Sequence, residues 1–154
     1  MSKIVKMSLL LVSLFFSTVS FSGGLTEQSV AQLIDAVDKA ANNKSAAPIG
    51  DAMTDNVKIV MNVEFQGQTQ VISPSKSEYL SLLEQGWAQS SNYKYSKSDV
   101  TIKIDGDKAF VSANVNESMT IQGQNISVFS KEKAVIELIN GKPFITEIVG
   151  YTSM

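Results

Sequence analysis

The amino-acid sequence predicts an α+β fold, because its helical and strand-like segments are grouped along the chain instead of alternating. Apolar residues recur at helical spacing in residues 27–41 and again in residues 76–89. From residue 57 onward, most other segments alternate between apolar and polar residues, as half-buried strands do. We expect a curved antiparallel sheet of about six strands, wrapped around two or three helices from the N-terminal and central parts of the chain.

The first helix is predicted over residues 27–41, with Thr26 as its N-cap. Its apolar residues follow the i, i+3, i+4, i+7 pattern of one buried face. Asp35 and Asp38 are predicted to lie on its polar side. The next segment is rich in small residues and is interpreted as a loop, with a short helical turn over residues 49–53.

The second long helix is predicted over residues 76–89. Ser75 and Glu78 have the Ser-x-x-Glu spacing of a capping box, in which each side chain bonds the other residue's backbone N–H. Its apolar face includes Tyr79 and Trp87. Aromatic residues at helical spacing fit a core position or the wall of a pocket.

Glycine-containing pairs divide the remaining chain into strands. Asp105-Gly106, Gln122-Gly123 and Asn140-Gly141 each predict a tight hairpin, because such turns need positive φ values that glycine and asparagine tolerate. The strands between them exceed the usual length, so we expect strong twist and at least one bulge. The predicted strands cover residues 57–65, 69–72, 93–104, 107–121, 125–139 and 142–152.

The first 22 residues have the layout of a secretory signal peptide. Two lysines precede an apolar run over residues 7–19, and serines stand three residues and one residue before a cut at Gly23. The alternative is a membrane anchor, but the run is shorter than the ~20 residues that a spanning helix needs. We therefore expect cleavage, with residues 23–154 forming one domain that is periplasmic or secreted and has no membrane span.

The composition excludes several kinds of chemistry. The 154 residues include no Cys and no His, and all 13 basic residues are Lys. Disulfides, thiolate sites, lipid attachment to Cys and the usual histidine base or metal ligand are therefore absent. We expect no metal, no cofactor and no nucleic-acid partner, since a net charge of −2 offers no basic footprint for phosphates.

The order of elements resembles the nuclear transport factor 2-like superfamily, which includes ketosteroid-isomerase-like and polyketide-cyclase-like (SnoaL-like) proteins. The resemblance rests on the helix 27–41, the lead 52–57 into the first strand, the helix 75–87 and the final hairpin 139–144, in which Phe144 follows a Gly-Lys turn. It implies a cystatin-like cone: a bent sheet wraps around the helices and leaves a pocket at the wide end. Many members dimerise through the outer face of the sheet.

For catalysis, the resemblance transfers no residue. Enzymes of this superfamily use His/Asp dyads, or a Tyr from the first helix together with acids in the pocket. This chain has no His, and residues 27–41 contain no Tyr.

Strand register predicts which residues line the pocket. Counted from the hairpin turns, the inner face of the sheet is mainly aliphatic but is interrupted by three carboxylates and two hydroxyls. Desolvation there would raise a Glu pKa and favour acid–base work or a ligand hydrogen bond. Alternatively, these glutamates reach solvent at the rim of the cone. With the indole of the second long helix, the pocket candidates are Glu117, Glu132, Glu147, Ser130, Tyr151 and Trp87.

The opposite face of the sheet mixes polar residues with large apolar ones. Such a face fits a homodimer interface, or alternatively the ordinary exposure of scattered apolar side chains. The dimer-face candidates are Phe110, Phe129, Val135, Phe144 and Ile148.

Together these observations favour a non-catalytic binding module that holds a small apolar ligand or a protein partner. One alternative is an isomerase- or dehydratase-like enzyme in which Glu117, Glu132 or Glu147 works with Tyr151 as acid–base groups. Another is a purely structural or inhibitory partner protein.

Overall fold

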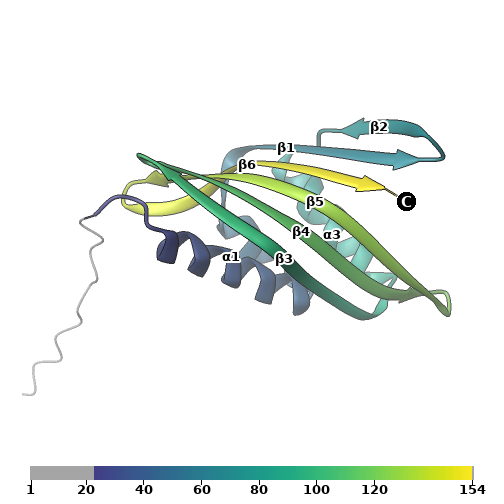
Figure 1. The fold of residues 1–154 in the computed structure, drawn as a ribbon. Coiled ribbons are helices and arrows are strands. Elements are labelled where there is room, and N and C mark those ends of the chain that lie inside the picture. The colour runs from purple at the N-terminus through teal and green to yellow at the C-terminus, as the bar shows by residue number, and fades with distance from the viewer. Residues whose placement is uncertain (1–22, 154) are drawn as a thin grey trace, which may run out of the picture.

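The computed structural model describes residues 23–153, which form three helices and one six-stranded sheet (Figure 1). The predicted signal peptide, residues 1–22, lies outside the described residues. The α+β prediction is confirmed. The helices are α1 (Glu27–Asn42), α2 (Ala46–Asp51) and α3 (Lys76–Ala88), and the strands are β1 (Met53–Phe65), β2 (Gln68–Ile72), β3 (Ser91–Asp105), β4 (Lys108–Ile121), β5 (Gln124–Ile139) and β6 (Lys142–Ser153).

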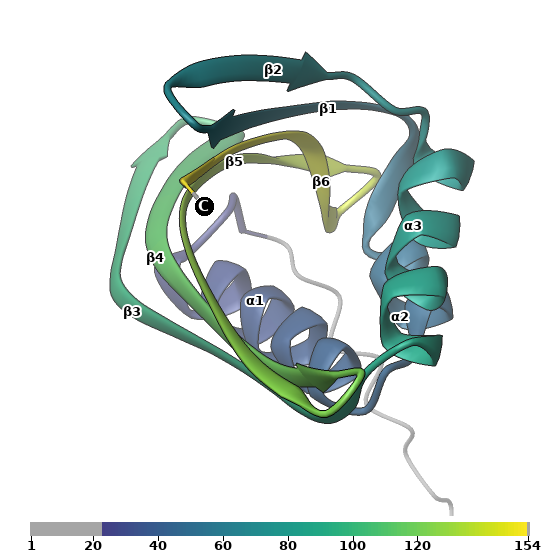
Figure 2. The ribbon, with the colours of Figure 1, turned by 90° about the vertical axis from the view of Figure 1, so that its right-hand side faces the viewer.

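The sheet has the strand order β2-β1-β6-β5-β4-β3. Strands β3 to β6 form the predicted antiparallel meander. The pair β1–β6 is parallel, which departs from a purely antiparallel sheet. No hairpin constrains this pair, because α3 and four further strands separate β1 from β6 along the chain. Figure 2 shows the sheet curving so that all three helices lie on its inner side.

Both long helices begin where their caps predict. The Thr26 hydroxyl accepts a hydrogen bond from the Ser29 backbone N–H, and the Ser29 hydroxyl accepts one from Thr26 N–H in return. Ser75 and Glu78 make the equivalent pair of bonds at α3. These reciprocal bonds satisfy backbone donors that the first helical turn leaves without partners.

The short helix begins earlier than predicted. It spans Ala46–Asp51 instead of residues 49–53, because Pro48 falls in its first turn, where a missing N–H costs nothing. Gly50 lies against α3, since a Cβ atom there would come within 2.8 Å of Leu80 Cδ1. This close approach packs α2 on α3.

The hairpin turns follow the predicted residue pairs, with one shift. Gln122-Gly123 and Asn140-Gly141 both adopt positive φ values, as a type I′ turn requires. In the β3–β4 hairpin, however, Asp105 pairs with Lys108, so the turn is Gly106-Asp107 and not Asp105-Gly106. The pairing moves by two residues, which leaves every side chain on its predicted face.

A bulge in β6 changes the faces of its second half. Ile136 pairs with Ile145 as predicted, but Val135 pairs with Glu147, so Thr146 is an inserted residue. A one-residue insertion moves all later side chains to the opposite face. Glu147 therefore points outward and Ile148 points inward.

A second bulge, in β3, likewise moves the side chains on one side of it to the opposite face of the sheet. Ser98 pairs with Asn114 and Thr101 with Ser112, which leaves Asp99 and Val100 opposite a single residue. Asp99 has φ +51°, the left-handed conformation found in bulges. Val100, next to the inserted residue, is 42% exposed.

The core lies between the inner face of the sheet and the helices. Ile136 and Val30 are its most deeply buried large side chains, at 1% and 0% exposure. Met53, Ile59 and Trp87 extend it toward α2 and α3. No helix between residues 23 and 153 combines the length and the apolar composition needed to cross a membrane.

Candidate functional site

A cavity of about 280 Å³ lies between the inner face of the sheet and helices α1 and α3. Most of its wall is aliphatic. This apolar part is contributed by Ile34 and Val37 of α1, Leu83 of α3, and Ile59, Met61, Val111, Ala113, Val115, Ala134, Ile136, Ile145 and Ile148 of the sheet.

One side of the cavity is polar, and a lysine lies at its centre. The Nζ atom of Lys97 on β3 is 2.7 Å from Asp38 Oδ1 on α1 and 3.9 Å from Glu132 Oε1 on β5. Only 9% of the Lys97 side chain is exposed. Its Nζ also lies 5.4 Å from the centroid of the Tyr95 ring. Lys97 therefore links one helix and two strands at the cavity wall.

A second polar pair lies beside this group. The Tyr93 hydroxyl donates a hydrogen bond to Glu117 Oε1 at 2.5 Å. The Tyr93 ring meets the Trp87 indole edge to face, with ring centroids 6.1 Å apart. Because the indole fixes the ring and the carboxylate fixes the hydroxyl, Tyr93 and Glu117 are held as one unit.

The pocket tyrosines remain hydrogen-bond donors at physiological pH. Burial raises the pKa of Tyr79 and of Tyr95, and the nearby charge of Glu132 raises both further. Burial also raises the pKa of Tyr93, together with its hydrogen bond to Glu117. The three hydroxyls thus stay protonated. Tyr93 already donates its proton to Glu117, so the hydroxyls of Tyr79 and Tyr95 are the remaining donors.

Glu132 is the carboxyl group most affected by the cavity. Burial raises its pKa above the ordinary value of 4.5, and the charges of Asp38 and Glu117 act in the same direction. Lys97 opposes them by favouring the charged form. Glu132 therefore takes up a proton more readily than an exposed Glu.

The C-terminal turn of α1 anchors β3 next to the cavity. The Asn42 side-chain amide donates to the Tyr95 carbonyl and accepts from the Tyr95 N–H, each at 2.9 Å. This pair of bonds replaces the sheet partner that an edge strand lacks. It holds the stretch of β3 from which Tyr95 and Lys97 enter the pocket.

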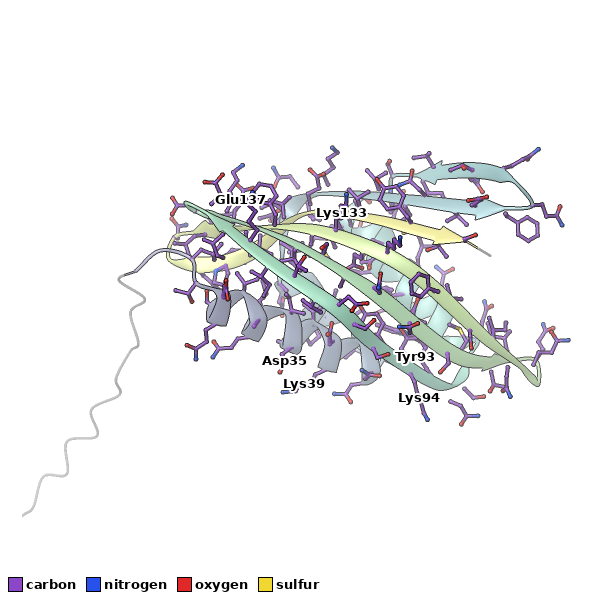
Figure 3. All side chains as sticks on the ribbon, in the orientation of Figure 1. Asp35, Lys39, Tyr93, Lys94, Lys133 and Glu137 are labelled. Atoms are coloured by element: carbon purple, nitrogen blue, oxygen red, sulfur yellow. The ribbon has the colours of Figure 1, made fainter. Side chains whose placement is uncertain are left out.

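One face of α1 carries an exposed ion pair, whereas the other contributes a carboxylate that pairs with Lys97 at the cavity wall. In Figure 3, Asp35 and Lys39 lie on the side of α1 turned away from the sheet, where they form an exposed ion pair of 3.8 Å. Asp38, one turn along, faces β3 and Lys97. Figure 3 also shows Lys94 projecting outward next to the inward-facing Tyr93.

Within the described residues, no group of three or more acidic side chains is arranged to hold a metal ion.

Comparison with known proteins identifies the fold. No family model matches the chain, and no curated protein is similar to it in sequence. Solved structures do match. A candidate scytalone dehydratase from Novosphingobium aromaticivorans aligns with a TM-score of 0.67 at 8% identity, over 82% of this chain and 83% of that one. A candidate dehydratase of the nuclear transport factor 2-like family from Streptomyces avermitilis aligns with a TM-score of 0.62 at 14% identity, over 82% and 95%.

A third structure, a nuclear transport factor 2-like protein with a cystatin-like fold from Novosphingobium aromaticivorans, aligns with a TM-score of 0.63 at 11% identity, over 81% and 80%. This chain has the nuclear transport factor 2-like fold. The predicted resemblance is thereby confirmed for the architecture, and such low identities say nothing of chemistry.

Four of the predicted pocket residues line the cavity of this nuclear transport factor 2-like fold: Glu117, Ser130, Glu132 and Trp87. For Glu147 and Tyr151 the prediction was wrong. Both lie on the outer face, where Tyr151 is 49% exposed and Glu147 pairs with Lys58 at 3.7 Å. The inserted Thr146 is the physical reason, because it reverses the faces of all later residues in β6.

The predicted dimer face is largely on the outer side of the nuclear transport factor 2-like sheet. Phe110 and Phe129 are 45% and 48% exposed there. Val135 pairs directly with Phe110, and Phe144 with Glu137, so both share this face. Ile148 does not, because the same bulge buries it in the cavity wall.

Sequence reasoning missed the centre of the site. Lys97 was not among the predicted pocket residues, and Asp38 was predicted to lie on the polar side of its helix. A signal was present, however. Tyr93 and Tyr95 alternate in one phase and Ile102 and Ile104 in the other, so both pairs can face inward only if a residue is inserted between them.

Proposed function

We propose that this chain is a binding protein that holds a small, mainly apolar molecule in its cavity. One observation carries the proposal: an apolar cavity of about 280 Å³ has a single polar wall, built from Lys97, Glu117, Glu132 and tyrosine hydroxyls. Ligand sites commonly combine apolar walls with a few polar groups that fix orientation. The volume lies just below the usual range for drug-sized ligands, which favours a smaller molecule.

The aliphatic walls would supply most of the binding free energy, because burial removes apolar surface of the ligand from water. The polar wall would supply selectivity. Tyr79 and Tyr95 offer hydroxyl donors, and within residues 23–153 neither hydroxyl belongs to a hydrogen-bonded pair like that of Tyr93 and Glu117. A ligand oxygen or nitrogen next to these two hydroxyls would accept their hydrogen bonds.

The raised pKa of Glu132 favours a second candidate function, an isomerase- or dehydratase-like enzyme. Two of the structures with the same fold carry candidate dehydratase names. In this scheme Glu132 or Glu117 would move a proton, and a pocket tyrosine would donate to the substrate oxygen. Tyr79 or Tyr95 takes the role that the sequence had predicted for Tyr151, because Tyr151 lies outside the cavity.

The two candidates differ in what the double variant Glu117→Gln/Glu132→Gln does. A binding protein would keep measurable affinity for its ligand, since amides preserve the shape of the wall. An enzyme would keep affinity but lose turnover, by about 100-fold or more for each acid–base group removed. Unchanged affinity, unchanged turnover and unchanged stability in this variant would remove both glutamates from either role.

A cavity-filling variant tests the binding proposal. Ala134→Leu adds a larger side chain to the wall, whereas Lys133→Leu adds a similar side chain to the outer face one residue away. Trp87 is the only Trp of the chain and lines the cavity, so its fluorescence reports occupancy there. We expect small apolar ligands that perturb Trp87 fluorescence to bind Ala134→Leu at least about tenfold more weakly than Lys133→Leu.

Equal affinity of the two variants for every such ligand would contradict binding in the cavity. Circular dichroism of both variants controls for folding.

We further propose that the protein works in the periplasm or outside the cell, after removal of residues 1–22. The Lys-rich start, the apolar run and the serines before Gly23 support this. The intact mass of the protein from its own compartment should correspond to a chain that begins at Gly23. A mass that includes the leader would contradict the proposal.

A further inference from the structure

The charges around the cavity are unbalanced. Three carboxyl groups, those of Asp38, Glu117 and Glu132, lie close together around the cavity, with one ammonium group, that of Lys97. Lys97 contacts Asp38 and Glu132. Within residues 23–153, Glu117 has no ion-pair partner and is held by the Tyr93 hydroxyl. The wall next to Glu117 therefore has negative charge without a cation to match it.

Aromatic rings surround the same part of the cavity. Trp87, Tyr79, Tyr93 and Tyr95 all line it. Ring faces attract cations, and a cation beside an aromatic ring and a carboxylate gains from both. The position of Lys97, 5.4 Å from the Tyr95 ring centroid, is one such arrangement already present in the wall.

We propose that the ligand of the cavity is a small organic cation: a protonated amine on an apolar body, with its ammonium group against Glu117 and the rings of Trp87 and Tyr93. The proposal rests on the proposed function, since it names the class of molecule that the cavity holds. The aliphatic wall formed by β4, β5 and α1 receives the apolar body.

Other charge types fit less well. A carboxylate or phosphate ligand would add a further negative group to a wall that has one lysine, and that lysine already contacts Asp38 and Glu132. A neutral alcohol would form hydrogen bonds with the tyrosine hydroxyls but would displace water from Glu117 without compensating its charge. An amine compensates that charge and completes the hydrogen bonding of the carboxylate.

Three probes of the same shape test this inference on the folded chain without its leader. They are 2-phenylethylamine, 2-phenylethanol and 3-phenylpropanoate, each titrated at low salt and followed by amide chemical shifts, which give both the affinity and the residues affected. We expect the amine to bind about tenfold more tightly than the alcohol, and the carboxylate to bind most weakly. The shifted amides should be those of cavity-lining residues.

Charge variants show whether Glu117 is responsible. Glu117→Gln should reduce the preference for amine over alcohol to near one, while Glu117→Asp keeps the charge and should keep most of the preference. Glu147→Gln is the matched control, because Glu147 is an outer-face glutamate that the sequence had placed in the pocket. It should leave the preference as in the wild type.

The outcomes separate the two proposals. If amine and alcohol both bind in the cavity with equal affinity, or if Glu117→Gln keeps the preference, the cation inference is overturned and the binding proposal remains. If none of the probes shifts cavity residues at the highest soluble concentration, both proposals are contradicted.

Discussion

Lys97 illustrates how a single side chain organises this site. Its ammonium group lies between carboxylates from α1 and β5, so it offsets charges that the apolar surroundings would otherwise disfavour. Its residue type did not indicate this position, and the only sequence signal was the phase of Tyr93 and Tyr95 relative to that of Ile102 and Ile104. Lysines are mostly exposed, and only the bulge at Asp99 turns Lys97 inward.

Replacing this lysine tests its structural role. Lys97→Met should lower the free energy of unfolding by about 2 kcal/mol, because Asp38 and Glu132 then face each other without a counter-ion. Lys39→Met is the control, since Lys39 forms an exposed pair with Asp35 and such pairs contribute little. Urea unfolding curves at pH 7 measure both. Equal changes in the two variants would contradict the buried role of Lys97.

The pH dependence of stability tests the environment of Glu132. Its pKa is raised in the folded protein, so the folded state holds this proton more tightly than the unfolded state does. Its stabilising effect is therefore complete below the ordinary pKa of 4.5 and is lost as the pH rises through the raised folded pKa. In Glu132→Gln this loss is absent.

We therefore expect the stability of Glu132→Gln relative to the wild type to increase from pH 4 to pH 7. Urea unfolding of both proteins at four pH values in this range gives the difference. A constant difference would mean that Glu132 titrates as an exposed residue.

At the scale of elements, the sequence predicted what depends on local patterns. Helical spacing and caps located α1 and α3, and glycine pairs located the hairpins, because these features act over a few residues. The bulge in β6 was beyond such patterns. Thr146 is an ordinary strand residue, and its insertion is decided by how β6 packs between two neighbouring strands.

Because the sequence did not locate the β6 bulge, only some of the pocket residues were predicted correctly. Glu117, Ser130 and Glu132 lie on β4 and β5, whose mutual pairing is regular, so counting from the turns placed them correctly. Glu147 and Tyr151 follow the β6 bulge and were misplaced. The position of Trp87 needed only the helical period of α3.

Two hydrogen bonds between the Asn42 side chain of α1 and the Tyr95 backbone of β3 form a clamp between these elements. This clamp gives a prediction at the scale of elements. Asn42→Ala removes both bonds to the Tyr95 backbone and should lower the free energy of unfolding by about 1–2 kcal/mol. It should also speed amide hydrogen exchange in β3 around Tyr95. Asn43→Ala, at the adjacent C-cap position, is the matched control. Exchange rates in β3 that match those of this control would show that the clamp does not hold the strand.

At the scale of the whole molecule, the curved sheet separates two surfaces with different uses. Its inner face and the helices enclose the cavity, whereas its outer face presents Phe110, Phe129 and Tyr151 to solvent. Val135 and Phe144 share that outer face. We propose this surface as the interface of a homodimer, since exposed apolar side chains that cluster on one face favour association.

Sedimentation tests the dimer. The protein without its leader should sediment as a dimer at micromolar concentration, and Phe110→Lys should shift it to a monomer. Val71→Lys is the control, because Val71 is also apolar and exposed but lies on β2, away from the outer-face residues of β4 and β5. A wild-type monomer at high concentration would contradict the interface.

The claim that the cavity holds a small molecule is tested most directly by native mass spectrometry of the protein purified from its own compartment. The predicted result is a species heavier than the chain by the mass of one small molecule per protomer, with that excess lost on denaturation and absent from Ala134→Leu. A mass equal to that of the bare chain before and after denaturation would contradict the claim.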